Sequence, residues 1–433
     1  MQRRTFLASS AAAILAGSPN SRVRVACVGL RARGRDHIQG LAKVPGVEIA
    51  ALCDIDESVM AARLEDARAV GAKPKVYMDF RKLLEDRSID AVALATPDHH
   101  HTLQTVWACE AGKDVYVEKP VAYDIYECRQ VAAAARKYGR VVQAGTQGRS
   151  SAAVQEAMMH LRKGLIGDAY MARALCFKWR ESIGRATPEA PPKGADYDQW
   201  IGPAPAKPFT RNRFHYNWHW SWDYGSGDIG NQAPHQLDIG RWGLGVTYPT
   251  RVSAMGGHFM FDDDQETPNT LVVTYEFEKD GRKKMLVAEV RHWITNHEAG
   301  IGNGDAQKNA IGNIFYGSNG ILTLDGTTWA GAGEGYRSFL GREMKDGPSR
   351  TQPSNHFHNF IEAVREHNPQ LLTAPIEEGA VTATLIHLAN ISYRLGRSLK
   401  FDARTFTCPG DVEATAMFGP RPYRKGYAVP KLV

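Results

Sequence analysis

The chain has 433 residues, of which 53 are basic and 47 acidic, so its formal net charge of +6 is small for its length. It contains no basic block with interleaved aromatic residues, which argues against nucleic-acid binding. The length exceeds that of one ordinary domain and predicts two domains that share an interface.

The first twenty residues have the composition of an export signal. Arg3 and Arg4 precede a run of small apolar residues, 8–17, which is too short to span a bilayer. The segment resembles a twin-arginine signal, although Gln2 replaces the usual hydroxyl residue and no lysine follows Leu7. We therefore expect residues 1–20 to be a signal, the protein to be periplasmic in a bacterium, and the mature chain to contain no membrane span.

The six cysteines form neither a CxxC pair nor a zinc-ligand pattern; they lie at positions 27, 53, 109, 128, 176 and 408. Cys27 and Cys53 fall inside predicted apolar strands, where a buried thiol is the ordinary state. We expect free thiols, which fits a protein that folds in the reducing cytosol before export.

Residues 21–146 are predicted to form a nucleotide-binding α/β domain. Apolar strands are predicted at 23–28, 47–53, 75–77, 89–95, 115–117 and 141–145, with helical spacing at 36–44, 58–70 and 131–138. Every strand except the first follows a helical segment. This alternation is typical of a right-handed, doubly wound, mostly parallel sheet.

The turn after the first strand carries two of the three glycines of a dinucleotide fingerprint. These are Gly29 and Gly34, with Arg31 at the middle place. Arg31 and Arg33 can add charge-assisted contacts to phosphate. Asp54 ends the second strand, where a carboxylate can accept from both ribose hydroxyls and repel a 2′-phosphate. The sequence predicts NAD as the cofactor, and the arginines keep NADP as the alternative.

Three consecutive histidines, His99 to His101, follow Thr96 and Pro97 at the end of the fourth main strand. Adjacent residues at a helix start point in different directions, so they cannot all ligate one ion. We expect one histidine to contact the cofactor and the others to face solvent, and we predict no metal site.

Glu118, Lys119 and Pro120 end the strand at 115–117. The carboxyl edge of a parallel sheet is where ligands bind, so Lys119 has a reason to be functional. The alternative interpretation is a solvated lysine in a turn.

Together, the glycine turn, Thr96-Pro97-Asp98 with His101, and Glu118-Lys119-Pro120 resemble the Gfo/Idh/MocA family of sugar and inositol oxidoreductases. The resemblance implies a Rossmann domain followed by an open-faced α/β domain, and it places Lys119 and His235 at catalytic positions. The cofactor-binding residues it implies, besides the glycine turn and Asp54, are Thr96, Pro97, His101, Glu118, Lys119 and Gln147.

In residues 147–400 the regular alternation of strand and helix is lost. A helix at 151–163 precedes strand-like runs at 169–179, 251–259, 270–277, 284–293 and 314–324, which predict a largely antiparallel sheet. The segment 180–215 is rich in proline and glycine and too long for a simple connection. We expect it to flank a sugar site.

Residues 217–242 combine aromatic side chains with amides and carboxylates, as a carbohydrate pocket requires. The alternative is an aromatic core under a helix. On one helix, Asp228, Asn231, His235 and Asp238 would share a face. Asn231 stands where the family commonly has an aspartate, so Asp228 or Asp238 is the candidate replacement. The predicted substrate-binding residues are Arg149, Trp222, Asp223, Asn231, Gln232 and Asp238.

The sequence therefore predicts an NAD-dependent oxidoreductase that acts on a small carbohydrate or polyol, with the cofactor tightly bound. Partial desolvation beside the nicotinamide would lower the pKa of Lys119 and make it a general base, with His235 as relay. Two alternatives stay open: a glycosidase that oxidises and re-reduces one sugar on bound NAD, and a carbohydrate-binding protein without activity. The tail at 401–433 is expected to wrap the surface or a neighbouring subunit of a homo-oligomer.

Overall fold

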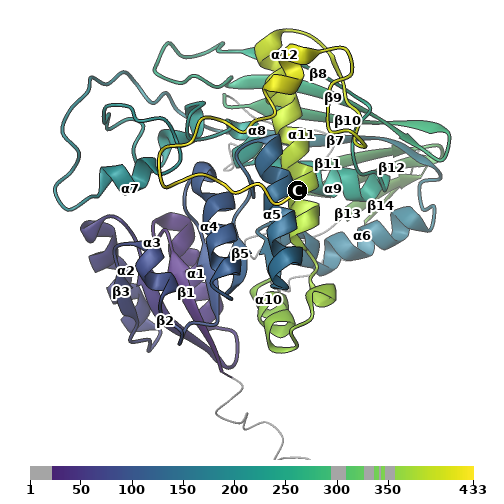
Figure 1. Cartoon of the computed structure of the whole chain (residues 1–433). Coiled ribbons are helices and arrows are strands. Elements are labelled where there is room, and N and C mark those ends of the chain that lie inside the picture. The colour runs from purple at the N-terminus through teal and green to yellow at the C-terminus, as the bar shows by residue number, and fades with distance from the viewer. Residues whose placement is uncertain (1–21, 294–308, 326–335, 341–342, 347–355) are drawn as a thin grey trace, which may run out of the picture.

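The computed structural model describes residues 22–293, 309–325, 336–340, 343–346 and 356–433, arranged as two α/β domains (Figure 1). The predicted signal at residues 1–20 lies outside this part of the chain. Among the helices that the structure describes, none combines the length and the apolar composition needed to cross a bilayer.

The first domain contains a six-stranded parallel sheet in the order β3-β2-β1-β4-β5-β6. The first three strands have the predicted limits, and in β1 and β2 the apolar run is bounded on both sides by glycine or a charged residue. The strands are β1 (Val23–Val28), β2 (Val47–Cys53), β3 (Lys75–Tyr77), β4 (Ala91–Leu94), β5 (Asp114–Val117) and β6 (Val142–Ala144).

Helices cover both faces of this sheet, as alternation along β1 requires. Val25 and Cys27 face the core beneath α1 and α2, whereas Ala26 and Val28 face α3, α4 and α5. The doubly wound fold class predicted from the sequence is confirmed. The helices are α1 (Ala32–Ala42), α2 (Glu57–Ala69), α3 (Phe80–Leu84), α4 (Asp98–Glu110) and α5 (Ile125–Tyr138).

The second domain contains a nine-stranded sheet in which only β7 and β10 pair in parallel among the described strands. This confirms the predicted largely antiparallel sheet, although β13 to β15 were not anticipated. The strands are β7 (Ala169–Lys178), β8 (Arg251–Gly257), β9 (Thr270–Lys279), β10 (Arg282–Arg291), β11 (Asn309–Gly317), β12 (Gly320–Asp325), β13 (Tyr336–Leu340), β14 (Glu343–Asp346) and β15 (Leu399–Lys400).

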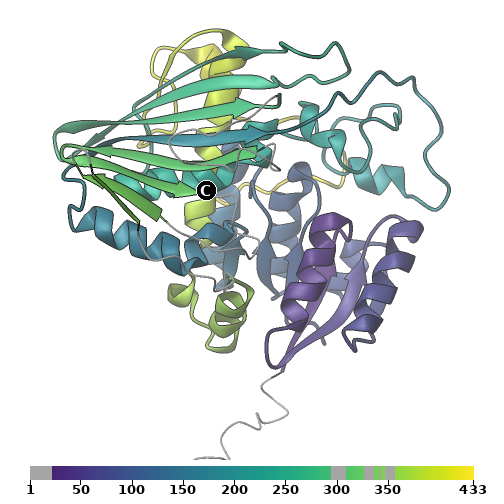
Figure 2. The ribbon, with the colours of Figure 1, turned by 180° about the vertical axis from the view of Figure 1, so that it is seen from behind.

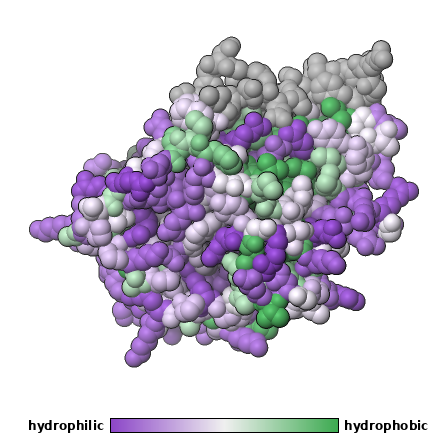
Figure 3. Space-filling model, turned by 90° about the horizontal axis from the view of Figure 1, so that it is seen from above, coloured by the Kyte–Doolittle hydropathy of each residue, from purple (hydrophilic) through white to green (hydrophobic). Residues whose placement is uncertain are grey.

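One face of this sheet packs on helices, as the view from behind shows (Figure 2). These are α6 (Ala152–Arg162), α9 (Ala233–Leu244) and α11 (Ile376–Leu395). A further helix, α10 (His356–Arg365), returns to the first domain, where Phe360 and Val364 join the core of its sheet. The face seen from above is mostly polar, with hydrophobic residues in small groups (Figure 3).

The single helix predicted around residues 228–238 is wrong. The chain forms a short α8 (Asp228–Asn231), bends at Gln232 and starts α9 at Ala233, with Pro234 in its first turn. Proline lacks the N–H group that would continue the hydrogen-bond ladder from α8. Asp228 and Asn231 therefore lie on a different helix from His235, whereas Asp238 follows His235 by three residues in α9.

Candidate functional site

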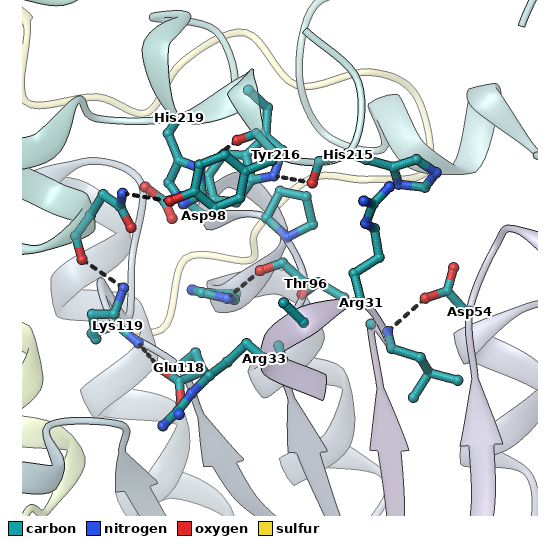
Figure 4. A pocket seen from close by; sticks show the side chains of 18 of the residues that line it. Arg31, Arg33, Asp54, Thr96, Asp98, Glu118, Lys119, His215, Tyr216 and His219 are labelled. Atoms are coloured by element: carbon teal, nitrogen blue, oxygen red, sulfur yellow. Dashed lines mark hydrogen bonds and ion pairs between the residues drawn. The ribbon is translucent and has the colours of Figure 1, made fainter. Parts of the chain in front are cut away.

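A cavity of about 520 Å³ lies between the carboxyl edge of the first sheet and the start of α9. Figure 4 shows Asp54 at one side of it, Lys119 and Glu118 at the other, and Tyr216 and His219 above. We call the side with Asp54 and the glycine turn the nucleotide end. We call the side with Lys119 and the α8–α9 junction the substrate end.

The turn between β1 and α1 lines the nucleotide end. Gly29 has a φ of +74°, and a Cβ atom there would lie 2.8 Å from the main chain of Ala95. A side chain is thus excluded on two grounds. Gly34 lies behind the turn and packs against Gly29 without lining the cavity. Because α1 begins at Ala32, four residues earlier than predicted, its N-terminal N–H groups adjoin the cavity, which suits an anion.

Asp54 lines the nucleotide end at the close of β2. One carboxylate oxygen accepts a 2.6 Å hydrogen bond from the amide of Leu30, and the other accepts from the amide of Asp56 at 3.0 Å. Burial raises the pKa of Asp54 to about 6. The carboxylate is thus held against the glycine turn, and it lines the cavity in which it was predicted to accept from ribose hydroxyls.

Glu118 forms a buried polar cluster under the middle of the cavity. Its Oε1 atom accepts from Arg33 at 2.7 Å and from Gln147 at 3.0 Å, and lies 3.1 Å from His37. Burial opposes ionisation of Glu118, but Arg33 and His37 hold its pKa well below the usual range. Arg33 is therefore committed to Glu118, which leaves Arg31 as the exposed cation of the turn.

All three consecutive histidines are buried, so the expectation that two of them face solvent is wrong. His101 lines the cavity between the carbonyl oxygens of Thr96 and Pro120, at 2.8 and 2.6 Å. His99 and His100 both contact the carbonyl oxygen of Trp200 in the second domain, which is why they are covered. Within the described ranges, no three histidine, cysteine or carboxylate side chains cluster as a metal site would require, and the six cysteines are free and buried.

Lys119 lies at the substrate end with its ammonium group turned to the second domain. Nζ donates a 2.7 Å hydrogen bond to the main-chain carbonyl oxygen of Asn231. Burial lowers the pKa of Lys119. Nearby Asp98 accepts from Ser226 at 2.9 Å, and burial raises its pKa to about 7.

His235 lines the substrate end from the first turn of α9. Burial, with Lys119 nearby, lowers its pKa to about 3, so the ring is neutral. The carboxylates proposed to assist it are engaged elsewhere, because Asp228 pairs with Arg180 at 3.1 Å and Asp238 with Arg149 at 2.6 Å. Neither carboxylate lines the cavity.

The predicted substrate-binding residues divide into two groups. Asn231 and Gln232 line the cavity, whereas the other four do not; these are Arg149, Trp222, Asp223 and Asp238. Arg149 is held by Asp238 and Glu378 in a buried ion-pair network. The main chain at Trp222 and Asp223 is held from outside the cap, since Tyr123 donates to the carbonyl oxygen of Trp222 and Arg421 to that of Asp223.

Residues that sequence reasoning did not select come from a segment that we call the cap, residues 180–227. The cap includes α7 (Tyr197–Ile201) and an aromatic core of Trp200, Phe209, Phe214 and Trp218. It brings His215, Tyr216 and His219 to the cavity. Its high content of proline and aromatic residues was the available signal, but only the fold shows which of its side chains reach the cavity.

The cap is attached to the first domain at the nucleotide end. The ring of His215 lies 2.6 Å from a carboxylate oxygen of Asp56, just after β2. His215 has a φ of +69°, a left-handed conformation that is strained for a residue with a side chain. The contact therefore places the cap over the cavity at a local conformational cost.

The tail, residues 401–433, fastens the cap from outside. One guanidinium group, that of Arg421, donates to the carbonyl oxygens of Asp223 and His99 at 3.0 and 3.1 Å and lies 3.7 Å from the centre of the Tyr123 ring. Arg424 donates to the carbonyl oxygen of Gly202 at 3.3 Å. Because Arg421 also lies 3.8 Å from Glu127, the tail joins the cap to α4 and α5 of the first domain.

Sequence models of one protein family match both domains. The model described as "Oxidoreductase family, NAD-binding Rossmann fold" matches residues 23–146, and that described as "Oxidoreductase family, C-terminal alpha/beta domain" matches residues 154–293. Both are models of the Gfo/Idh/MocA oxidoreductases. Together they match more than half of the chain.

Similar proteins include an inositol 2-dehydrogenase/D-chiro-inositol 3-dehydrogenase of Shouchella clausii, 32% identical over 155 residues, which are 35% of this chain and 44% of that protein. An alpha-N-acetylgalactosaminidase of Shewanella oneidensis is 33% identical over 114 residues, 25% of either chain. The chain thus matches less than half of the length of these two relatives.

Solved structures share the fold at low sequence identity. An aldose-aldose oxidoreductase from Caulobacter crescentus has a TM-score of 0.67 at 18% identity and covers 88% of this chain and 100% of its own. A levoglucosan dehydrogenase in complex with NADH and levoglucosan has a TM-score of 0.65 at 18% identity. The match covers 88% of this chain and 99% of the levoglucosan dehydrogenase.

Proposed function

The chain belongs to the Gfo/Idh/MocA family of oxidoreductases, and we propose that it transfers hydride between NAD and a hydroxyl-bearing carbon of a carbohydrate or polyol. The observation that carries the proposal is that Lys119 and His235 line the same cavity as the glycine turn and Asp54. Groups suited to a nucleotide and groups suited to proton transfer thus share one space. A binding protein without activity would have no use for this arrangement.

The residues of the nucleotide end fit a dinucleotide. The missing side chain at Gly29 and the N-terminus of α1 suit a pyrophosphate, and Asp54 offers a carboxylate to ribose hydroxyls. Bound NAD would supply the hydride acceptor. We propose NAD in preference to NADP because the carboxylate of Asp54 would repel a 2′-phosphate.

The residues of the substrate end supply the proton chemistry. The lowered pKa of Lys119 favours its neutral amine, which is the form that acts as a general base for the substrate hydroxyl. The carbonyl oxygen of Asn231 orients that amine. His235 is neutral and can pass a proton on or hydrogen-bond the developing oxyanion.

The test starts from full-length protein and asks which nucleotide copurifies, by mass spectrometry, and in which redox state, by absorbance. Polyols and aldoses, myo-inositol among them, are then added, and formation of the reduced nicotinamide is followed. Protein shown to hold NAD that is reduced by none of these compounds would contradict the proposal.

A second candidate is a glycosidase that oxidises and re-reduces its sugar on one retained NAD. It is favoured by the attachment of the cap at two places, through His215 to Asp56 and through Arg421, which joins Asp223 of the cap to His99 in α4. An exported enzyme, as the first twenty residues lead us to propose, has no cytosolic nucleotide pool from which to replace a lost cofactor. Retention would then be a condition for activity.

A further inference from the structure

Lys178, the last residue of β7, brings a second amino group to the substrate end of the cavity. Its Nζ atom donates a 3.1 Å hydrogen bond to the side-chain oxygen of Gln232, which also lines the cavity. Burial, with Arg180 nearby, lowers the pKa of Lys178. Among the described residues, the only hydrogen-bond partner of this half-buried ammonium is thus a neutral amide.

The carboxylate of Asp228 acts on Lys178 from nearby and opposes the lowering of its pKa, but it forms no ion pair with the ammonium. Asp228 pairs with Arg180 at 3.1 Å and lies 3.2 Å from His292. In the part of the chain that the structure describes, no ion pair involves Lys178. Burial of an unpaired ammonium is costly, so its retention in a cavity calls for an anionic partner that the protein itself does not provide.

The three carboxyl groups that line the cavity are also not available to pair with Lys178. Asp54 lies at the nucleotide end, and Glu118 is paired with Arg33. Asp98 has a pKa raised to about 7 by burial and accepts from Ser226. The substrate end therefore presents two lysines, Lys119 and Lys178, without a fully ionised, unpaired carboxylate among the described residues that line it.

We propose that Lys178 and the side-chain amide of Gln232 bind a carboxylate on the substrate, so that the substrate is an acidic carbohydrate of the uronate class. The proposal rests on the hydride-transfer function proposed above and names its substrate class. Lys178 would give a charge-assisted hydrogen bond, and the N–H groups of Gln232 would give a second contact. The reacting carbinol would then lie beside Lys119 and His235.

The phosphates of the cofactor are not the partner of Lys178. Phosphates are expected at the glycine turn and the N-terminus of α1, with Arg31 beside them. Lys178 comes from the second domain and is anchored on Gln232, the residue after the one that holds Lys119. Lys178 is therefore positioned to contact the substrate.

The experiment compares matched glycosides that differ only at one carbon. Methyl β-D-glucopyranosiduronate and methyl β-D-galactopyranosiduronate are tested against the corresponding neutral methyl glycosides and their 6-sulfates. Binding to the NADH-loaded protein is measured by calorimetry, and kcat/KM is measured with NAD. We expect the wild type to bind one uronate at least about tenfold more tightly than its neutral partner, as for a desolvated charge pair.

Lys178→Met should abolish this preference, whereas Lys178→Arg should retain most of it. Lys284→Met is the control, because Lys284 donates to the carbonyl oxygen of Ala169 at the opposite end of β7. The control should keep the wild-type preference and show that loss of a half-buried lysine from this sheet is not enough to remove it.

The outcomes separate the two proposals. Equal affinity for acid and neutral glycosides, no binding of any uronate, or a preference that survives Lys178→Met would overturn the carboxylate site and leave hydride transfer standing. Tighter binding of a 6-sulfate than of its uronate would also overturn it. A Lys178-dependent preference for a uronate without reduction of the cofactor would support the site and count against the proposed hydride transfer.

Discussion

The ammonium group of Lys119 donates a hydrogen bond of 2.7 Å to the main-chain carbonyl oxygen of Asn231, 112 positions later in the chain. The bond joins the end of β5 in the first domain to the α8–α9 junction in the second. It uses the backbone and not the side chain, so an amide in place of a carboxylate at position 231 leaves it intact. The orientation of Lys119 therefore depends on the fold of the second domain.

Replacement of Lys119 by methionine should lower kcat by about two to four orders of magnitude, the usual worth of a positioned acid or base. Nucleotide binding should persist, because the glycine turn and Asp54 are untouched. Steady-state kinetics and nucleotide content by mass spectrometry check this. Lys82→Met, which changes an exposed lysine of α3, is the control and should behave as wild type. Near-normal turnover in Lys119→Met would remove this lysine from the mechanism.

Replacement of His235 by alanine should likewise lower kcat by about two to four orders of magnitude while the nucleotide stays bound. The ring is already neutral at pH 7, with a pKa of about 3, so we expect no step near pH 6 in the wild-type kcat profile from this residue. A kcat that titrates near pH 6 and loses that step in His235→Ala would show that its pKa is not lowered.

Discrimination against NADP should depend on pH. The pKa of Asp54 is raised to about 6, so its carboxylate is charged above that value and mostly protonated at pH 5. Repulsion of a 2′-phosphate requires the charged form. The ratio of the dissociation constants for NADP and NAD should therefore be larger at pH 8 than at pH 5.

Asp54→Asn supplies the control for this titration, because a phosphate also loses a proton near pH 6. The variant should bind NADP more nearly like NAD at pH 8, and any pH dependence left in it belongs to the phosphate itself. If wild type and variant show the same pH dependence, Asp54 does not select the cofactor.

Loosening the tail should speed nucleotide release. Arg424→Ala removes a bond to the carbonyl oxygen of Gly202 in the cap, and Arg421→Ala removes the guanidinium that joins cap, α4 and α5. We expect the dissociation rate to rise several-fold in the first variant and about tenfold or more in the second, measured by stopped-flow with competing nucleotide. Arg404→Ala, on an exposed part of the same tail, should match wild type. Unchanged rates in a folded Arg421→Ala would show that the tail does not retain the cofactor.

If the cofactor is recycled within the enzyme, candidate glycosides should be turned over in buffer that lacks added nucleotide. Solvent deuterium should then enter a carbon beside the transient carbonyl group, as detected by mass spectrometry. Accumulation of free NADH, one for each substrate consumed, would instead identify a simple dehydrogenase.

The Rossmann sheet could be predicted from the sequence because its signals are local. Each apolar strand is bounded by its own glycine or charged residue, as in β1 and β2, and the pattern alternates at short range. The start of α1 at Ala32 was not predicted, because the arginines of the glycine turn interrupt the helical spacing of apolar residues. The break at Gln232 could not be read from the spacing of the polar residues, which continues through it, because the break depends on Pro234 in the first turn of α9.

The site residues that follow the ends of strands could be predicted from the sequence, whereas those that the cap brings to the cavity could not. Asp54 and Lys119 line the cavity because they close β2 and β5. Trp222, Asp223 and Asp238 were chosen by composition, yet their partners come from distant segments, such as Arg149 for Asp238. His215, His219 and Lys178 reach the cavity through tertiary packing that no local pattern encodes.

The position of Arg421 also sets an order of events during synthesis. The guanidinium that closes the cap over the cavity is made after both domains, since the residues it joins, such as His99 and Asp223, precede it on the ribosome. A nascent chain can therefore fold both sheets with the cap still unfastened. If nucleotide binds in that interval, the bonds that Arg421 then forms to the cap and to α4 would slow its release.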